Sequence, residues 1–219
     1  MHMKRYCLIL AFLLIIVNTN SQSVKRTVFD DVDFVVEPIR TINTVVSDIS
    51  PFFVGDQLFF SSVREQYFNK DRRANKNKAF YDVYKADLNA DGILVSSRTL
   101  VPGFGADYHE GPAAYCKATG ELFITLSNVT HPDTLRKMFP VEDVRLRLAI
   151  MTKVDGVWKV KEELPFNDDR FHFAHPAINP TGDTLVFSSD IDSLTIGKAD
   201  LFMSVRKDGS WSDPINLGH

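Results

Sequence analysis

The chain has 219 residues, of which 44% are hydrophobic and 11% aromatic, an ordinary globular composition that suffices for one large domain or two small ones. Phenylalanine, with 17 residues against 2 tryptophans, dominates the aromatic residues and favours β-sheet. Residues 1–21 hold two basic and no acidic side chains, so the chain after them has 23 basic and 28 acidic residues, a net charge of −5. That charge argues against a protein that binds nucleic acid or an anionic membrane surface.

Residues 1–21 have the pattern of a signal peptide. Lys4 and Arg5 precede an unbroken apolar run, Leu8–Val17, which is about half as long as a membrane span. Small residues lie just before Gln22, where cleavage is expected. The sequence therefore predicts an exported protein, with an uncleaved anchor helix as the alternative.

The two cysteines limit the chemistry of the exported chain. Cys7 lies before the apolar run, whereas the lipid-bearing cysteine of a lipoprotein follows it, so lipid attachment is not expected. After cleavage Cys116 is the sole cysteine, which excludes an internal disulfide. We interpret it as a small buried hydrophobic residue rather than a nucleophile.

Residues 22–46 form an N-terminal segment ahead of three repeats. Within it, VVEPIRTINT (35–44) has the pattern of an outer strand that closes a ring by pairing with a blade from the other terminus. Its residues EPIRTINT resemble the sequence expected directly after the NLG that ends a blade. The strand is therefore expected to belong beside a blade that this chain does not contain.

Three segments align, and each has a proline, a short apolar strand, a turn with glycine and a second apolar strand. Leu58, Leu122 and Leu185 are equivalent, at spacings of 64 and 63 residues. The aligned segments are SDISPFFVGDQLFFSS (47–62), HEGPAAYCKATGELFITLS (109–127) and AHPAINPTGDTLVFSS (174–189).

A second pair of strands follows in each repeat, joined by an Asp-Gly turn. Asp-Gly between apolar strands is a strong hairpin signal, because both residues tolerate positive φ. The link between the two hairpins varies in length, which places its insertions on one side of a stacked structure. The residues that define the repeat are Pro51, Pro112, Pro176, Asp91, Gly92, Asp155, Gly156, Asp208, Gly209, Trp158 and Trp211.

Four strands per period predict an all-β fold, a β-propeller of four-stranded antiparallel blades. The expected blades are 47–104, 105–168 and 169–219. Three blades make an open arc and thus an incomplete propeller, with the bare face of the third blade in solvent. The alternative is a three-repeat sandwich or barrel. Phe60, Ile124 and Phe187 share one register, which predicts that all three are buried between blades. The exposed face of the third blade predicts that the chain dimerises or aggregates.

The third repeat resembles a known family. HPAINPTGDTLVFSSD, followed by ADLFMSVRKDGSWSDPINLG (199–218), resembles the TolB-type, WD-like propeller repeat of bacterial envelope proteins, and above all the propeller of Bacteroidota OmpA-family proteins. The resemblance covers about residues 36–219. It implies a periplasmic or outer-membrane-associated protein and leads us to expect further blades in a longer parent. The helical-repeat and peptidoglycan-binding domains found in many family members are absent from this sequence.

No catalytic, cofactor or metal site is predicted. DLNADG (87–92) starts like a calcium loop, but Arg98 stands where the bidentate acid is needed, and the segment coincides with a hairpin turn. His172 and His175 are three apart on a strand and face opposite sides, so we interpret them, like His109, as structural contacts near the start of a blade. The serines lack a G-x-S-x-G elbow.

The basic stretch KDRRANKNK (70–78) lies in the long link of the first repeat. It is either a solvated charge run or a docking loop for a partner, since loops on a rigid scaffold often carry binding. The residues of the docking hypothesis are Lys70, Arg72, Arg73, Lys76 and Lys78.

The sequence thus predicts a non-catalytic binding or scaffold module of the cell envelope, without a cofactor. Its loops and central funnel would meet unidentified envelope proteins or cell-wall components. The alternative is the N-terminal accessory propeller of a longer exported hydrolase or glycan-binding protein.

Overall fold

The computed structural model divides the chain into two units, Met1–Glu37 and Pro38–His219. The residues it describes lie in the second unit and are 38–40, 42–63, 80–89, 94–104, 108–127, 145–191 and 193–218, with 94–98 described as backbone alone. The signal peptide, the Asp91-Gly92 turn and the whole basic stretch 70–78 fall outside them. Those predictions therefore remain predictions.

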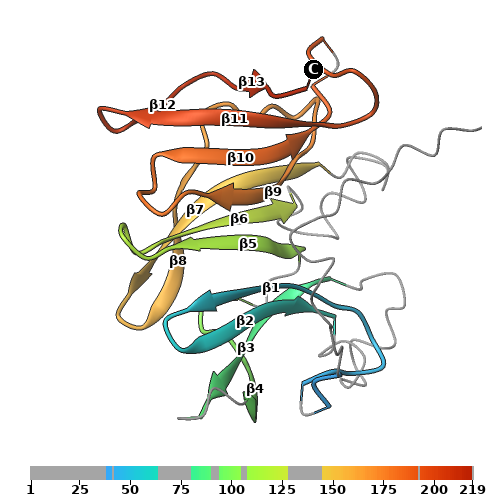
Figure 1. Ribbon diagram of the computed structural model, residues 1–219, viewed down its shortest axis with the longest axis vertical. Coiled ribbons are helices and arrows are strands. Elements are labelled where there is room, and N and C mark those ends of the chain that lie inside the picture. Colours follow the sequence, from blue (N-terminus) through green and yellow to red (C-terminus); the bar gives the residue numbers. More distant parts are fainter. Residues whose placement is uncertain are drawn as a thin grey trace, which may run out of the picture. The chain divides into compact units, whose positions relative to one another are not determined.

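The described residues form thirteen strands and no helix, and the strands make three antiparallel sheets (Figure 1). The first blade comprises β1 (Asp48–Val54), β2 (Gln57–Ser62), β3 (Asp82–Leu88) and β4 (Leu94–Leu100). The second comprises β5 (Glu110–Cys116), β6 (Glu121–Ser127), β7 (Leu146–Val154) and β8 (Val157–Glu163). The third comprises β9 (Phe173–Ile178), β10 (Thr184–Ser189), β11 (Asp200–Lys207), β12 (Ser210–Trp211) and β13 (Ile215–Asn216).

In the first two sheets every strand pairs with the next along the chain. In the third, β9, β10 and β11 pair in the same way, and both β12 and β13 pair with β11. The first strands of the blades lie side by side, with β5 in contact with both β1 and β9. None of the sheets closes on itself. This arrangement confirms the prediction of propeller blades that form an incomplete ring, and it excludes the sandwich or barrel.

The Asp-Gly turns of the second and third blades have the geometry that their sequence demands. Asp155 and Gly156 have φ of 51° and 82°, and Asp208 and Gly209 have φ of 50° and 82°. Two consecutive residues with positive φ make the two-residue hairpin turn that matches the twist of the strands. The tryptophans follow in the same register, because Trp158 pairs with Lys153 and Trp211 pairs with Arg206.

Each blade has two faces, which we name by their neighbours in the chain. The backward face of a blade points to the preceding blade and carries the aligned leucine, Leu58, Leu122 or Leu185. The forward face points to the following blade and carries the residue after it, Phe59, Phe123 or Val186. Alternation along a strand separates the two sets.

Two hydrophobic clusters hold the blades together. One joins the forward face of the first blade to the backward face of the second, and the other joins the second blade to the third. The first cluster contains Phe59, Val83, Val101, Phe104, Leu122, Ile124, Ala149, Met151 and Trp158. The second contains Cys116, Phe123, Leu148, Ile150, Leu164, Phe173, Leu185, Phe187 and Phe202.

The predicted burial of three residues is confirmed, but one of their positions is wrong. Phe60, Ile124 and Phe187 are all buried. Ile124 and Phe187 lie between blades, whereas Phe60 lies on the backward face of the first blade, where its cluster includes Ile42 from the N-terminal segment. Phe60 thus lies on the face that its register predicts, but no described blade precedes the first one.

Residues 38–47 include the described part of the expected ring-closing strand. Backbone N–H groups of Ile42 and Asn43 both donate to the Ile39 carbonyl, so this part forms a turn. It pairs with no strand of the described chain, and its ring-closing role remains a prediction. Among the described residues there is also no helix with the length and hydropathy of a membrane span.

Candidate functional site

The first strand of every blade carries a β-bulge at the repeat proline. The residue before Pro51, Pro112 or Pro176 has positive φ in each case, and the pairing register shifts at the same place. These preceding residues are Ser50 (53°), Gly111 (98°) and His175 (56°). A bulge bends a strand and redirects its side chains, so the three prolines mark a bend that is built into each blade.

The bulge of each later blade touches a hydroxyl of the blade before it. The backbone N–H of His175 donates to Oγ1 of Thr125 over 3.0 Å. At the equivalent place in the second blade, a Cβ added to Gly111 would lie 2.0 Å from Oγ of Ser61. The side chain of Ser61 thus leaves no room for a Cβ at this position, and the φ of 98° also favours glycine.

Two histidines, 63 residues apart in the sequence, make the same contact between blades. Nδ1 of His109 accepts a hydrogen bond from the backbone N–H of Tyr81 over 3.3 Å, and Nδ1 of His172 accepts one from Leu146 over 3.2 Å. In each case the donor lies at or just before the start of the third strand of the preceding blade. The interpretation of these histidines as structural contacts at the start of a blade is confirmed.

The backbone N–H of each of these histidines also contacts its own blade. His109 donates to Oγ of Ser127 over 3.1 Å, and His172 donates to Oδ1 of Asp190 over 2.5 Å. Ser127 is the last residue of β6, and Asp190 comes directly after the last residue of β10. Each histidine therefore ties the end of one interstrand link to the beginning of the next.

Burial lowers the pKa of His109, whose ring also meets Phe80 edge-on at 5.1 Å. Nearby, burial together with the charge of Glu110 raises the pKa of Tyr108. The neutral imidazole is the form that can accept at Nδ1. The site is thus suited to holding this hydrogen bond.

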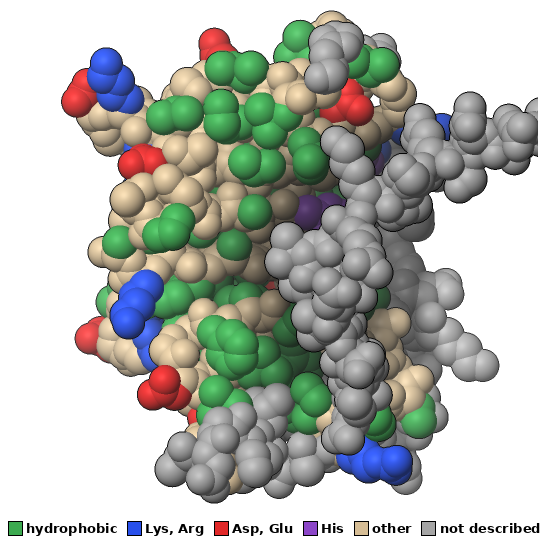
Figure 2. Space-filling view, in the orientation of Figure 1, with side chains coloured by type: hydrophobic (Ala, Val, Ile, Leu, Met, Phe, Trp, Pro, Cys, Tyr) green, Lys and Arg blue, Asp and Glu red, His purple; other side chains and the backbone are tan. Residues whose placement is uncertain are grey.

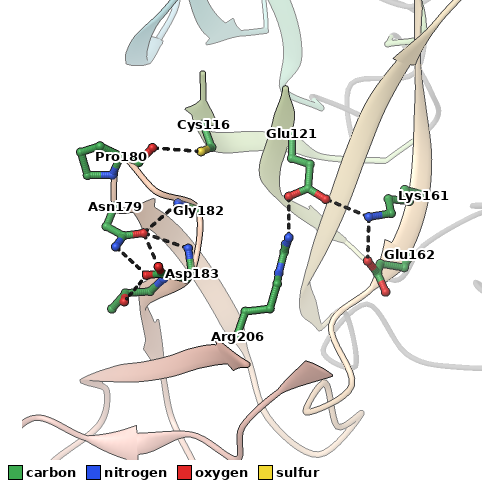
Figure 3. Close-up of polar contacts among 10 residues, drawn as sticks. Cys116, Glu121, Lys161, Glu162, Asn179, Pro180, Gly182, Asp183 and Arg206 are labelled. Atoms are coloured by element: carbon green, nitrogen blue, oxygen red, sulfur yellow. Dashed lines mark hydrogen bonds and ion pairs between the residues drawn. The ribbon is translucent and has the colours of Figure 1, made fainter. Parts of the chain in front are cut away.

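An ionic network joins the second and third blades at the start of β6, the opposite end of this strand from the His109 contact (Figure 3). The carboxylate of Glu121, with 5% of its side chain exposed, accepts from Nζ of Lys161 at 2.8 Å and from the guanidinium of Arg206 at 2.9 Å. Burial alone would raise the pKa of Glu121, but the pKa is lowered, because the hydrogen bonds with Lys161 and Arg206, the charge of Arg206 and a hydrogen bond with Thr119 together outweigh burial. Arg206 also stacks on Trp211 and Phe123, at 4.6 and 5.7 Å.

A compact turn completes this interface. Oδ1 of Asn179 accepts from three successive backbone N–H groups, those of Gly182, Asp183 and Thr184 (Figure 3). The thiol of Cys116 contacts the carbonyl of Pro180 at 3.6 Å and is otherwise buried. Cys116 is a packing residue, as the sequence predicts.

The forward face of the third blade is open. Hydrophobic side chains gather over β10 and β11 on the side shown in Figure 2. The exposed large hydrophobic residues of the third blade and its loop are Leu194, Ile196, Leu201, Val205, Ile215 and Leu217. The predicted bare face is therefore present in this chain.

Within the described ranges, no cluster of three or more histidine, cysteine, aspartate or glutamate residues could hold a metal ion. The serine pairs Ser61-Ser62 and Ser188-Ser189, which lack a G-x-S-x-G elbow, recur at equivalent positions at the ends of β2 and β10. The bulges contain the repeat prolines Pro51, Pro112 and Pro176. The clusters between blades include Trp158, and Trp211 packs against the second of them.

No protein-family model and no curated protein matches this sequence. Among solved structures, a glycoside hydrolase is similar over 77% of this chain and 51% of its own, with a TM-score of 0.44 and 13% identity. A puromycin-hydrolysing peptidase of Mycobacterium tuberculosis is similar over 82% of this chain and 32% of its own, with a TM-score of 0.38 and 11% identity. The chain thus spans about half or less of the length of either structure.

Proposed function

We propose that this chain is a non-catalytic binding module, a stiff scaffold that presents the links between the second and third strands of its blades to a partner in the bacterial envelope. The TolB-type resemblance motivates the envelope location. The histidine contacts supply the physical support, because they fix the positions from which adjacent links depart.

The links of the first and second repeats meet at His109. Tyr81 lies where the first link returns to β3, and Ser127 lies where the second link departs from β6. Hydrogen bonds of 3.3 and 3.1 Å join both to the same histidine. Loops with anchors held in this way lose less conformational entropy on binding than loops on mobile supports.

The basic stretch of the first link is the proposed contact with the partner. Five positive side chains on one link would attract an acidic partner surface and raise its association rate. The rest of the chain is acidic overall, so the attraction would be specific to this link.

The test replaces Lys70, Arg72, Arg73, Lys76 and Lys78 with glutamine in the full-length protein and identifies partners by chemical crosslinking in its native cells. A matched control replaces five lysines at exposed positions on the blades and turns, which are Lys117, Lys153, Lys159, Lys198 and Lys207. We expect the first variant to lose a crosslinked partner that the control keeps. Equal crosslinking of both variants would refute the role of this link.

A further inference from the structure

The hydrogen bonds between blades also fix the tautomer of two histidines. Nδ1 of His109 accepts from the backbone N–H of Tyr81, and Nδ1 of His172 accepts from that of Leu146. A ring nitrogen that accepts carries no proton, so the proton of each neutral imidazole is on Nε2. Both rings lie at the ends of the strands from which the interstrand links depart, which we call the link side. The fold therefore sets two N–H donors on this side.

The two Nε2–H groups are available to a ligand. Both imidazoles are only half-buried, and the described contacts of His109 and His172 leave Nε2 without a partner. The fixed tautomer also argues against metal binding. A zinc ion needs the lone pair of a ring nitrogen, but that of Nδ1 is already occupied and Nε2 holds a proton. The two rings thus offer hydrogen-bond donors.

The surroundings of His109 favour an uncharged ligand. Protonation of its ring would remove the acceptor that holds Tyr81, and burial lowers its pKa, so the imidazole does not supply a cation. Burial and the charge of Glu110 together raise the pKa of Tyr108, and that same charge would repel an anion. A neutral donor beside a negative charge is suited to an uncharged oxygen, such as a hydroxyl or a carbonyl.

Aromatic side chains accompany both donors. The rings of Phe80 and Tyr81 lie 5.1 and 5.8 Å from the ring of His109. Phe171 directly precedes His172 in the chain, and all three aromatic residues are half-buried. Aromatic surfaces with a few fixed polar groups are typical of ligand sites. A sugar matches this combination, because its C–H faces stack on aromatic rings and its oxygens accept from neutral donors.

We propose that the link side of the second and third blades binds a neutral oligosaccharide, with Nε2–H of His109 and of His172 donating to oxygens of different sugar units. The two donors occupy equivalent positions in consecutive blades, so they suit a ligand whose acceptors also repeat. This inference rests on the proposed binding role of the link side. It does not involve the basic stretch 70–78, which stays unchanged in every variant below.

The test follows the imidazole nitrogens of the full-length protein by NMR, with isotope-labelled histidine. Without a ligand, both histidines should give the signals of the Nε2–H tautomer. We expect the Nε2 signals of both to shift when cellohexaose or N-acetylchitohexaose, two uncharged probes, is added. Polygalacturonate, which is anionic, and an uncharged glycine–serine peptide should leave them in place.

Asparagine at either position separates ligand binding from the contact between blades. Its amide oxygen replaces Nδ1 as the acceptor, but the side chain is too short to reach the place of Nε2. His109→Asn and His172→Asn should therefore keep the fold and each weaken saccharide affinity by about two- to tenfold, the value of one neutral hydrogen bond. His175→Asn is the matched control and should keep the affinity, because His175 is exposed and its described contact uses the backbone N–H.

Three results would overturn the proposal. Signals of the Nδ1–H tautomer would remove the donors. Binding of neither neutral probe would show that the site takes no such saccharide, and binding of the peptide instead would assign it to a polypeptide. Failure of the crosslinking test above would leave this titration interpretable, because the titration needs no protein partner.

Discussion

The imidazole of His109 accepts a hydrogen bond from the backbone N–H of Tyr81 in the preceding blade, with 3.3 Å between Nδ1 and the nitrogen. Protonation of the ring would abolish this acceptor and place a positive charge in a half-buried site. The contact between the first two blades therefore depends on a neutral histidine.

The stability of the protein should consequently depend on pH through His109. Burial lowers the pKa of His109 from its ordinary value of 6.5, so the unfolded chain binds the proton more readily. The stabilisation is complete above pH 6.5 and is lost as the pH falls through the lower pKa of the folded state. Urea unfolding between pH 7.5 and 5 should show this loss. His109→Asn keeps an acceptor but cannot bind the proton, so it should reduce the dependence of the unfolding free energy on pH. If that dependence stays unchanged, His109 is not its source.

The carboxylate of Glu121 should contribute to stability through its two cationic partners. Glu121→Gln leaves Arg206, with 18% of its side chain exposed, without its charge partner and should cost about 1–3 kcal/mol of unfolding free energy. Glu162→Gln, at a side chain that is 48% exposed, is the control and should cost less than about 1 kcal/mol. Because the pKa of Glu121 is lowered, its contribution should be lost as the pH falls below 4.5. Denaturant titrations of both variants provide the measurement.

Phe187 should be one of the costliest core residues to truncate. Its ring stacks on Phe166 at 4.9 Å and on Phe202 at 6.0 Å, and it is fully buried between the second and third blades. Phe187→Ala should destabilise the protein by about 3–5 kcal/mol. Phe53→Ala, at a side chain that is 56% exposed, should cost much less. A loss below about 1 kcal/mol for Phe187→Ala would mean that the interface is not formed as described.

Gly182 and Gly156 separate backbone strain from contact between blades. Their φ values are nearly equal, 79° and 82°, so alanine should cost each about 1–2 kcal/mol for its conformation. A Cβ at Gly156 meets nothing within 4 Å, whereas one at Gly182 lies 2.7 Å from Cγ2 of Thr119 and 3.0 Å from Sγ of Cys116. Gly182→Ala should therefore lower the melting temperature further than Gly156→Ala. Equal decreases in melting temperature for the two variants would show that Thr119 and Cys116 move to accommodate a Cβ at position 182.

The strands could be predicted from the sequence because their signals are local. Asp155-Gly156 and Asp208-Gly209 specify their turns by themselves, and alternating apolar residues specify which faces are buried. The spacing of the equivalent leucines then shows that the unit repeats. Each of these inferences uses residues that are close together in the chain or related by the repeat.

The contacts between blades could not be predicted in the same way. Glu121 and Arg206 are 85 residues apart, and no pattern around either one identifies the other as its partner. The bulge at each repeat proline has a visible signal, since Ser50, Gly111 and His175 all precede a proline, but these three residue types share no feature that predicts their positive φ. Similarly, Phe60 could be placed on the correct face without knowing what covers it.

The stacking of blades through adjacent interfaces alone makes this chain behave like a one-dimensional array. In such an array the stability of each unit depends on how many neighbours it has. The second blade is held on both faces, whereas the third is held on one. Amide hydrogens should therefore exchange most slowly in β6 and β7 and fastest in β11 and β13, and unfolding should proceed from the C-terminal blade inward.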